Sequence, residues 1–427
     1  MRILITGASG FIGTQLTRSL QAGGHQIIAC TRQPKALKYV SDNVEAVHID
    51  FNKAYETSAW LPLLNNIDVV INAVGIFKET RQQTFNRIHA QTPSALFQAC
   101  ELAGVKRVIQ ISALGTDDTA FSPYHLSKLA ADNCLQQLEL DWVIVKPSIV
   151  YSRCSSSMNF FKAMANLPIV PIIENGQQQI QPIHIDDFCK AIRQMVSFNT
   201  HGKINIDMVG PEPISIKELY SCLHQWLGKG LAHFISIPYS LTHFLAFLFA
   251  PLTKMPISAD AINMLRKGNT ADVQTFIDTF GFRPKSVEQI FKETPAQQTD
   301  RWHAGLYFLN PLLRFAIAFL WIYTGFVSAF VYPVEQSYKM LAEVGITEQW
   351  QPVALYSASL LNILFGLFTL VSYRLVLIGL LQITVIILYS ILITFSLPEQ
   401  WLHPFGPVSK NIPIIISILI MMVLSKR

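Results

Sequence analysis

The chain has 427 residues, enough for two or three domains, and its composition of 51% hydrophobic and 14% charged residues is too apolar for an ordinary soluble enzyme. The net charge of +5 is spread along the chain without a basic run, which excludes a typical nucleic-acid-binding surface. The apolar excess lies at one end. Residues 305–427 hold only six Lys/Arg and four acidic residues, whereas the preceding part has the composition of a globular α/β protein.

All six cysteines lie in that preceding part, and no CxxC motif occurs. This usage favours reduced cytosolic thiols over a disulfide framework or a zinc site. The chain opens with an apolar strand pattern and not with a charged-then-apolar leader, so we expect no signal peptide. We therefore expect the first part to lie on the cytoplasmic side of a membrane, in the simplest case the bacterial inner membrane.

The first predicted elements are a buried strand, a tight turn and a helix. Apolar residues 3–5 lead into Gly7, Gly10 and Gly13, and a helical pattern follows. Gly7 permits the turn, Gly10 lets backbone N–H groups approach a pyrophosphate, and Gly13 lets the helix pack closely on the strand. Because the helix N-terminus is left open for an anion, this context predicts dinucleotide binding.

A second strand pattern runs from His25 to Thr31 and ends at Arg32, with Lys35 and Lys38 close behind. An acidic residue at this place would hydrogen-bond the ribose 2′-OH of NAD, whereas an arginine suits the additional phosphate of NADP. We therefore predict that NADP(H) is preferred to NAD(H). The alternative is a solvated loop arginine.

Further strand patterns cover Val44–Phe51, Ile67–Gly75 and Val105–Ala113, and a helix is predicted at Thr92–Leu102. The first of these strands ends in Asp50, whose side chain could meet the adenine edge. The next strand runs into small residues, which let a cofactor lie against the backbone. Alternating strands and helices at this spacing predict an α/β fold with a parallel, doubly wound sheet of the Rossmann type.

Candidate catalytic residues follow the fifth strand. Pro123 starts a helical run that places Tyr124 and Lys128 on one helical face, one turn apart. An ammonium group beside a phenol favours phenolate and makes Tyr124 a usable acid/base near neutral pH. Ser112, at the carboxyl end of its strand, could hold a carbonyl oxygen for that tyrosine. The YxxxK spacing also arises by chance, so its position after the fifth strand gives it its weight.

These segments together resemble the extended or atypical short-chain dehydrogenases/reductases. The resemblance covers about residues 1–295 and rests on Thr6–Gly13, Ser112, Tyr124 with Lys128, Val145–Tyr151, Gln181–Asp187 and Val209–Ile216. Within that superfamily, Ser112–Gly115 and the context of Arg32 are most similar to the branch that includes the nucleotide-binding accessory subunit of respiratory complex I. Members of that branch can hold NADP(H) structurally without turning it over.

The resemblance implies roles for individual residues. Tyr124 would be the acid/base, Lys128 would bridge the ribose and the tyrosine, and Ser112 would orient the substrate. Pro147 and Ser148 would line the nicotinamide end. The predicted cofactor-binding residues are Thr6, Gly7, Gly10, Phe11, Ile12, Gly13, Thr31, Arg32, Asp50, Phe51, Ala73, Val74, Gly75, Lys128, Pro147 and Ser148.

Two later segments have less specific patterns. His184, Asp186 and Asp187 are metal-ligating residue types, but polar residues directly after an apolar run are more typical of a strand-to-helix junction with an N-cap. We predict no metal site there. The stretch Phe234–Leu252 is too interrupted for a membrane span. It is either core of a small substrate domain, which we prefer, or a helix on the membrane surface.

Four apolar stretches follow, at Pro311–Tyr332, Val353–Ser372, Leu375–Ser396 and Ile412–Leu424. The first three reach the roughly 20 residues of a bilayer crossing, and the fourth is shorter. Placing Arg374 and the terminal Lys426–Arg427 inside predicts that the first part and the C-terminus are both cytoplasmic. With Leu306–Arg314 and Trp321–Gly325, this region resembles the DoxX-like four-helix membrane family. For Arg314 itself we prefer a snorkelling arginine to a lipid or quinone headgroup site.

We therefore predict an NAD(P)-binding Rossmann domain at 1–230, a small substrate domain at 231–300 and a membrane domain at 301–427. The predicted function is a membrane-anchored NADP(H)-dependent oxidoreductase that moves hydride to or from a carbonyl or alcohol carbon. Because the anchor presents the site to lipid, we expect a lipophilic substrate. The alternatives are a nucleotide-sugar epimerase or dehydratase, and a nucleotide-loaded scaffold or redox sensor for a partner membrane complex.

Overall fold

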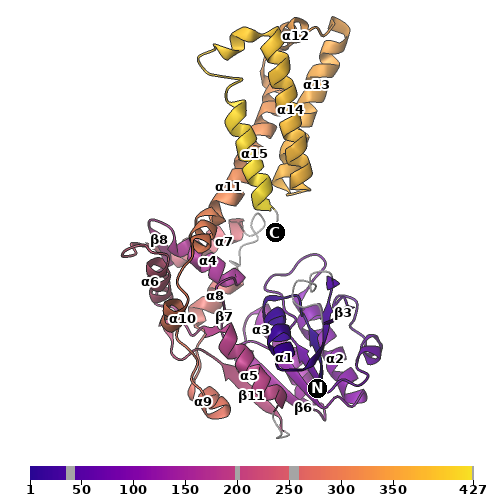
Figure 1. Ribbon diagram of the computed structural model, residues 1–427, viewed down its shortest axis with the longest axis vertical. Helices are drawn as coiled ribbons and strands as arrows, with labels where there is room; N and C mark the ends of the chain where they lie inside the picture. Colours follow the sequence, from indigo (N-terminus) through magenta and orange to yellow (C-terminus); the bar gives the residue numbers. More distant parts are fainter. Residues whose placement is uncertain (35–43, 198–201, 250–258, 426–427) are drawn as a thin grey trace. The chain divides into compact units, whose positions relative to one another are not determined.

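The computed structural model describes residues 1–34, 44–197, 202–249 and 259–425. The chain divides into two compact units, Met1–Ala304 and Gly305–Arg427 (Figure 1). The finer division of the first unit at residue 230 stays a prediction. Lys35, Lys38 and the terminal Lys426–Arg427, for which the sequence predicts roles, lie outside the described residues.

The first unit is built on a seven-stranded sheet with the order β11-β6-β5-β4-β1-β2-β3, and all six pairings are parallel. Parallel strands are covered on both faces, which is why they appear in the sequence as short continuous apolar runs. The predicted doubly wound parallel sheet is confirmed. The strands are β1 Arg2–Thr6, β2 Gln26–Thr31, β3 Glu45–His48, β4 Val69–Asn72, β5 Arg107–Ile111, β6 Asp141–Pro147 and β11 Ile204–Met208.

Helices cover both faces of this sheet. Because side chains alternate along a strand, Ile3 and Ile5 pack in the core with α1 and α5, whereas Leu4 packs in the opposite core with α2 and α3. The helices are α1 Phe11–Ala22 and α5 Ile185–Ser197 on one face, and α2 Thr92–Leu102 and α3 Pro123–Gln136 on the other. Short 3-10 turns occur at Thr57–Ala59 and Leu61–Leu63.

The strand order reverses at β1. The chain passes from β1 to β2 and β3 on one side, and then to β4, β5, β6 and β11 on the other. In open α/β sheets this reversal opens a crevice at the carboxyl ends of the strands, and ligands bind there. The glycine turn after β1 and the small residues after β4 therefore border the crevice.

A small lobe follows the sheet and has its own core around Tyr151, Ile172 and Tyr220. Three two-stranded pairs frame this core: β7 Val150–Tyr151 with β10 Ile183–His184, β9 Gln179–Ile180 with β12 Ile214–Ser215, and β8 Val170–Ile173 with β13 Phe234–Ile237. Its helices are α4 Ser156–Ala165, α6 Ile216–Trp226 and α10 Val287–Glu293, whereas α9 Gln274–Phe280 packs against the large sheet. β10 runs directly into α5, so the strand-to-helix junction predicted at His184–Asp187 is present.

The stretch Phe234–Leu252, which was predicted to be core, is more exposed in its described part than that prediction requires. It forms β13 and then α7, Tyr239–Phe249, which packs against α8, Ala259–Lys267. On α7, Leu241 and Phe244 are 46% and 58% exposed, and no residue from 234 to 244 is buried. Phe234 packs against the core of the small lobe, whereas the side chains of Leu241 and Phe244 are exposed, so the core assignment holds only for the start of this stretch. Residues 250–252 lie outside the described residues.

The second unit consists of helices, of which three are long and apolar enough to cross a bilayer. Figure 1 shows α13, α14 and α15 side by side. The first span was predicted to begin at Pro311, but its helix α11 begins at Gln298 and continues through Pro311. The helices are α11 Gln298–Phe326 with a π-helical extension Val327–Val331, α12 Val334–Glu343, α13 Gln351–Leu370, α14 Leu375–Ser396 and the shorter α15 Asn411–Ser425, with 3-10 turns at Glu348–Trp350 and Pro398–Trp401.

Small residues let these helices approach closely. A Cβ on Gly366 of α13 would lie 2.7 Å from the carbonyl oxygen of Ala318 on α11, and one on Gly379 of α14 would lie 2.7 Å from the Met422 sulfur on α15. Close backbone approach of this kind is how helices associate where no hydrophobic effect drives them together. Arg314 donates a hydrogen bond to Ser372 between α13 and α14, so its guanidinium has a protein partner.

Candidate active site

The three positions after β1 are occupied by glycine for different steric reasons. Gly7 has φ +68°, and a Cβ there would lie 2.8 Å from the carbonyl oxygen of Ala73. A Cβ on Gly13 would lie 2.9 Å from Ala8 Cα. At Gly10, by contrast, the one contact a Cβ would make among the described residues is with the Gly7 oxygen, at 3.1 Å. The fold therefore requires Gly7 and Gly13, whereas Gly10 leaves space on its outer side for a ligand.

The N-terminus of α1 is open for an anion. Gly10 is its N-cap and supplies no side chain, and the first turn holds no acidic residue. The amide groups of Phe11 and Ile12 therefore stand at the positive end of the helix beside the crevice. Together with the space at Gly10, this arrangement fits the pyrophosphate of a dinucleotide.

A buried polar line joins the ends of three neighbouring strands, and the sequence analysis did not anticipate it. Thr6 Oγ1 of β1 donates to Asn72 Oδ1 of β4 at 2.6 Å, and Asn72 Nδ2 donates to Gln110 Oε1 of β5 at 2.7 Å. All three side chains are at most 1% exposed. Because each polar group is satisfied, the line holds the carboxyl ends of these strands in register beneath the crevice.

The predicted ribose site lies at the end of β2. The hydroxyl groups of Thr31 and Ser9 are hydrogen-bonded at 2.6 Å, which joins this strand end to the glycine turn. Arg32 follows directly and is exposed. Its place next to the crevice is the one that a ribose-phosphate contact requires.

The predicted adenine residues differ in what they offer. Asp50 is half-buried, and its Oδ1 accepts hydrogen bonds from the backbone and side-chain amides of Asn52. Phe51 is buried, and its ring packs edge-on against Trp60 at 5.4 Å. The Phe51 side chain therefore belongs to the core, and Asp50 is the polar side chain at this strand end.

The segment after β4 and the loop after β6 border the nicotinamide end predicted from the resemblance. A Cβ on Gly75 would lie 3.7 Å from Lys128 Nζ, so this backbone passes close to the lysine. Ala73 donates its amide to the Thr6 carbonyl, and Val74 packs against the α2/α3 core. On the other side, Ser148 is buried, and its hydroxyl donates to the Gln181 carbonyl. The neighbouring Pro147 carbonyl accepts from the Leu114 amide at 2.9 Å.

Tyr124 and Lys128 lie on the first two turns of α3. Ser122 caps this helix by accepting from the His125 amide at 3.2 Å, and Pro123 occupies its first turn. Both side chains are buried, at 8% and 5% exposure. Lys128 Nζ donates to the Ile111 carbonyl at 2.9 Å and lies 5.9 Å from the centroid of the Tyr124 ring.

The Tyr124 ring lies in an apolar enclosure. Phe77 stacks on it with a centroid separation of 5.2 Å, and Phe85 meets it edge-on at 6.0 Å. Ala113 from the end of β5 and Met264 from α8 pack against the same group. Phe77 itself is 77% exposed, so one wall of the enclosure lies at the surface. A substrate that reaches Tyr124 on this side meets aromatic carbon, and the rings of His89 and His125 also meet the tyrosine edge-on.

Burial dominates the electrostatics of this pair. It raises the pKa of Tyr124 above its ordinary value and lowers the pKa of Lys128 to about 8, although the charge of Asp132 partly opposes the second shift. The sequence predicts instead that the ammonium favours the phenolate. In this arrangement burial outweighs that effect on the pKa of Tyr124, and Lys128 Nζ donates to the Ile111 carbonyl.

Ser112 lies near this pair but directs its hydroxyl elsewhere. Its Oγ donates to Asp132 Oδ2 and lies 3.1 Å from Thr116 Oγ1. Asp132 is 1% exposed and stands one helical turn beyond Lys128. In this arrangement Ser112 contacts the carboxylate behind Lys128, so its predicted role in orienting substrate stays a prediction. The i, i+4 spacing of Lys128 and Asp132 is the sequence signal that could have identified the second residue.

His89 completes the site and had no clear sequence signal. It lies in a π-helical turn, Asn86–Gln91, before α2, and its ring meets Tyr124 edge-on at 5.4 Å. Nε2 accepts from the Ile76 amide at 2.9 Å, so the proton is on Nδ1, which lies 3.0 Å from Ser127 Oγ. Burial, and then the charge of Lys128, lower the pKa of His89 to about 2. The ring is therefore a neutral wall of the site.

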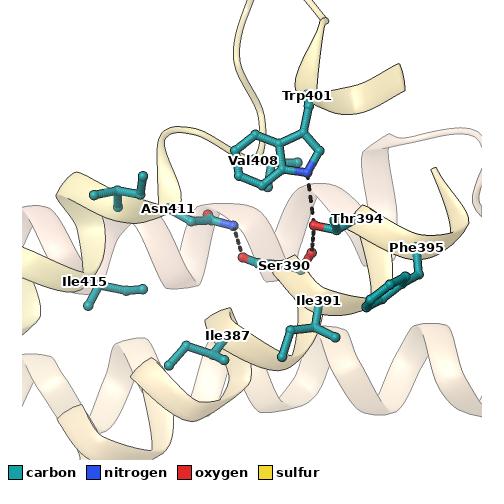
Figure 2. Close-up of a pocket in the computed structure, with 10 residues that line it drawn as sticks. Ile387, Ser390, Ile391, Thr394, Phe395, Trp401, Val408, Asn411 and Ile415 are labelled. Atoms are coloured by element: carbon teal, nitrogen blue, oxygen red, sulfur yellow. Dashed lines mark hydrogen bonds between the residues drawn. The ribbon is translucent and has the colours of Figure 1, made fainter. Parts of the chain in front are cut away.

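The membrane unit contains a separate cavity of about 310 Å³ between α14 and α15 (Figure 2). Most of its lining is apolar, but a row of hydrogen bonds crosses it. Asn411 donates to Ser390 Oγ at 2.8 Å, and Trp401 Nε1 donates to Thr394 Oγ1 at 2.9 Å (Figure 2). These side chains satisfy one another and tie the turn at Pro398–Trp401 to α14.

Comparison with known families separates the chain into the same two parts. Residues 7–160 match the NAD(P)H-binding family, and residues 318–419 match the DoxX-like family. The first match covers the glycine turn, the crevice and α3, and the second covers most of the membrane unit.

The first part also has curated relatives. It is 24% identical over 245 residues to the mitochondrial NADH dehydrogenase (ubiquinone) 1 alpha subcomplex subunit 9 of Rattus norvegicus, covering 56% of this chain and 63% of that protein. It is 26% identical over 198 residues to the ceramide reductase of Caulobacter vibrioides, covering 46% and 60%. The chain thus spans less than two thirds of the length of each of these relatives.

Among solved structures, the fold is similar to that of MoeE5 in complex with UDP-glucuronic acid and NAD, with a TM-score of 0.52 and 21% identity over 69% of this chain and 97% of that one. At this level of identity the likeness concerns the fold. Sheet order, glycine geometry and family matches agree. The chain therefore combines a Rossmann domain that matches the NAD(P)H-binding family, and is similar to the NADH dehydrogenase alpha-subcomplex subunit 9, with a C-terminal helical domain that matches the DoxX-like family.

Proposed function

We propose that this protein is a membrane-bound, NADP(H)-dependent short-chain oxidoreductase that reduces a carbonyl group, or oxidises an alcohol, on a lipophilic substrate. The observation that carries the proposal is the pairing of Tyr124 with Lys128 on α3 inside an apolar enclosure beside the crevice. The cofactor, when bound, supplies or accepts hydride. The proposal places the Rossmann domain and the C-terminus on the cytoplasmic side of the membrane.

The residues of this chain would handle the proton. In the direction of reduction, the Tyr124 hydroxyl donates a proton to the substrate oxygen as negative charge develops there. A pKa raised by burial keeps Tyr124 protonated at neutral pH, which suits an acid. Lys128, charged below a pH of about 8, stabilises the phenolate that remains. The enclosure of Phe77 and Phe85 excludes water from this transfer.

The substrate class follows from the same enclosure. Phe77, Phe85, Ala113 and Met264 offer carbon surface around Tyr124, which favours an apolar substrate over a sugar nucleotide. The chain carries its own membrane helices, which supply lipid at high local concentration. A similar protein is named ceramide reductase, and that name supports a reductase that acts on a lipid.

The test is NADPH oxidation by the full chain in lipid nanodiscs, with and without a total membrane-lipid extract. We expect oxidation that depends on the extract and follows a hydrophobic fraction on separation. Oxidation supported equally by the water-soluble fraction would contradict the lipophilic assignment. Tight NADPH binding without turnover in any fraction would contradict the enzyme itself.

A second candidate is a nucleotide-loaded scaffold for a membrane complex. The relationship to a subunit of NADH dehydrogenase favours it. It differs from the enzyme in what it requires of Tyr124, because a scaffold needs the bound nucleotide but no proton transfer. Co-purification with a stoichiometric membrane partner that survives loss of the Tyr124 hydroxyl would support this candidate.

Arg32 is expected to set the cofactor preference. Arg32→Ser removes the cation next to the ribose site, so we expect the Kd for NADPH to rise by about tenfold or more and the Kd for NADH to change little. Titration of cofactor fluorescence measures both constants. Arg18→Ser on α1, outside the predicted ribose site, serves as the charge-matched control. Equal weakening for the two cofactors would show that Arg32 does not contact the phosphate.

The pH dependence of the reduction rate is expected to follow the protonation state of Lys128. The pKa of Lys128 is lowered to about 8, so the reduction rate should fall as the pH rises through about 8 and the ammonium loses its proton. The carboxylate of Asp132 raises the Lys128 pKa, so Asp132→Asn should move this alkaline limb to lower pH. An unchanged limb would mean that Asp132 holds no charge in the working enzyme. Steady-state rates from pH 6 to 10 measure the limb.

A further inference from the structure

A cavity of about 310 Å³, at the lower end of the size range of small-molecule sites, is lined by residues of the small lobe and of helices α1 and α5. None of the residues that line it belongs to the predicted catalytic or cofactor-binding set. We call it the Arg153 cavity. Its lining is Gln15, Tyr151, Ser152, Arg153, Cys154, Met158, His184, Ile185, Asp186, Trp226, Ile290, Phe291 and Thr294.

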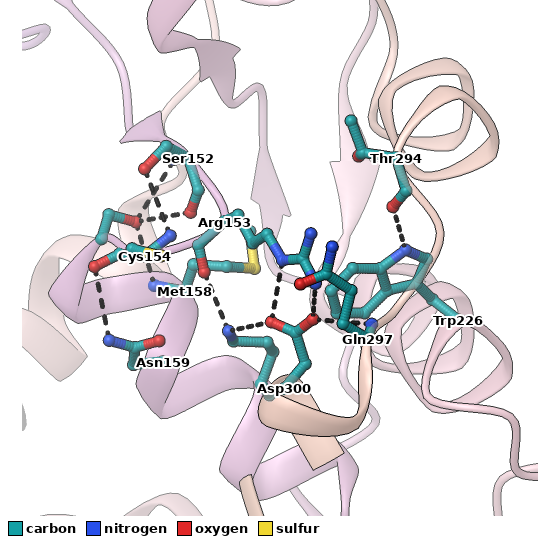
Figure 3. A network of polar contacts seen from close by, with 11 residues as sticks. Ser152, Arg153, Cys154, Met158, Asn159, Trp226, Thr294, Gln297 and Asp300 are labelled. Carbon is teal, nitrogen blue, oxygen red and sulfur yellow. Dashed lines mark hydrogen bonds and ion pairs between the residues drawn. The ribbon is translucent and has the colours of Figure 1, made fainter. Parts of the chain in front are cut away.

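A buried cluster of three charges adjoins this cavity (Figure 3). Arg153 pairs with both carboxylate oxygens of Asp300, through Nε at 3.1 Å and through Nη2. Lys162 Nζ donates to Asp300 Oδ1 at 3.2 Å and to the Arg153 carbonyl at 2.8 Å. The Gln297 amide also donates to Asp300, at 2.9 Å. The side chains of Lys162 and Asp300 are only 2% and 5% exposed.

The cluster has a net charge of +1. It has two cations and one carboxylate, and within the described part of the chain no second carboxylate forms an ion pair with either cation. Asp186 lines the cavity, but its side chain is 86% exposed and its ion-pair contact is with His184. Arg153 is the cation of the cluster that lines the cavity, and its side chain is 30% exposed, so the surplus positive charge favours an anion at its open side.

Two further features indicate an organic anion. Tyr151 lines the cavity, is 1% exposed, and its hydroxyl has no hydrogen-bond partner among the described residues. A buried hydroxyl is normally satisfied, so it indicates a missing partner. On the other wall, Trp226 and Phe291 stack at 5.1 Å and offer a flat apolar surface.

We propose that the Arg153 cavity binds a small organic anion, with its carboxylate or phosphate group at Arg153 and Tyr151 and its planar apolar part against Trp226 and Phe291. The charge of the ligand balances the cluster, the Tyr151 hydroxyl donates to a ligand oxygen, and the aromatic wall selects against inorganic anions. The site is independent of the oxidoreductase activity proposed above.

The test is calorimetric titration of the full chain in nanodiscs with phenyl phosphate. Saturating NADPH is present throughout, so that the pyrophosphate site is filled. Inorganic phosphate supplies the charge without the ring, and phenol supplies the ring without the charge. We expect phenyl phosphate to bind at least tenfold more tightly than either. No heat from phenyl phosphate would overturn the proposal, and equal affinity for inorganic phosphate would overturn the role of the aromatic wall.

Variants locate the site. Arg153→Gln leaves Lys162 and Asp300 as a balanced pair, so we expect the protein to fold and the phenyl phosphate affinity to fall at least tenfold. Arg301→Gln is the matched control. Arg301 follows Asp300 in the sequence, but its side chain donates to the Leu227 carbonyl and does not line the cavity. Equal losses in both variants would mean that only long-range attraction between the protein's positive charge and the anion is at work, and this would overturn the site.

A milder change keeps the proposal testable if Arg153→Gln unfolds. Tyr151→Phe removes only the unpartnered hydroxyl and preserves the ring, so the melting temperature should be retained. We expect a severalfold weaker affinity for phenyl phosphate. Unchanged affinity in Tyr151→Phe would overturn the placement of the anion.

Discussion

Tyr124→Phe is expected to lower NADPH-dependent reduction by about 10²–10⁴-fold, the usual contribution of a positioned general acid. The substitution removes the proton donor, and the ring that packs against Phe77 and Phe85 remains. The loss should therefore appear in kcat, whereas the Kd for NADPH and the melting temperature stay close to those of the parent protein. Single-turnover oxidation of NADPH with the active lipid fraction measures it.

A matched variant separates chemistry from packing. Tyr220 is a second fully enclosed tyrosine, in the core of the small lobe and outside the predicted site, so Tyr220→Phe should leave the rate nearly unchanged. If Tyr124→Phe retained the parent rate, proton transfer would have to come from another group and the assignment of Tyr124 would be wrong. If both variants lost activity equally, the loss would reflect folding.

Gly13→Ala is expected to have the other large effect. The added Cβ would lie 2.9 Å from Ala8 Cα and within overlap distance of the Gly7 backbone, and backbone atoms cannot move aside as a flexible side chain does. Overpacking of this kind costs about 3 kcal/mol at the upper end of its usual range. Because the overlap is between backbone atoms that are present with and without cofactor, we expect this cost as a loss of about 3 kcal/mol in the free energy of unfolding. Equilibrium denaturation by urea measures it.

The control for this variant is Gly230→Ala. A Cβ on Gly230 would meet nothing within 4 Å among the described residues, so the substitution should leave cofactor affinity and stability nearly unchanged. An unchanged free energy of unfolding in Gly13→Ala would mean that α1 can shift away from the turn at little cost. The close approach of α1 to the turn after β1 would then be no requirement of the fold.

The sequence predicted the large sheet well because its strands are buried on both faces. A short apolar run such as residues 3–5 or 69–71 can satisfy its backbone only within a covered sheet, and the glycines after β1 fix where that sheet meets a helix. The stretch after Phe234 was harder to predict, because composition does not say which surface a helix contacts. Phe234 packs against the small-lobe core, whereas Leu241 and Phe244 are exposed.

The candidate catalytic pair was accessible to sequence reasoning because Tyr124 and Lys128 lie on one helix, where spacing determines the face. The surroundings were not, since Phe77, His89 and Met264 come from three separate segments that only the folded chain brings to Tyr124. Nor could spacing reveal where the Ser112 hydroxyl points. That direction depends on Asp132, which competes with any substrate for the same donor.

The membrane helices were predictable in number and approximate length, because hydropathy alone measures both. Their starts were less so. Proline at position 311 marks a helix end in most soluble contexts, yet α11 passes through it.

The number of residues in the π-helical turn at Asn86–Gln91 sets the position of Phe85 beside Tyr124. A π turn holds one residue more than the α-helical turn it replaces, so losing a single residue between 86 and 91 would let the segment tighten into continuity with α2. Everything before it would then rotate by about 100° relative to that helix. Phe85 would leave the edge of Tyr124. Descendants of this sequence can therefore change many residues here more readily than they can change their number.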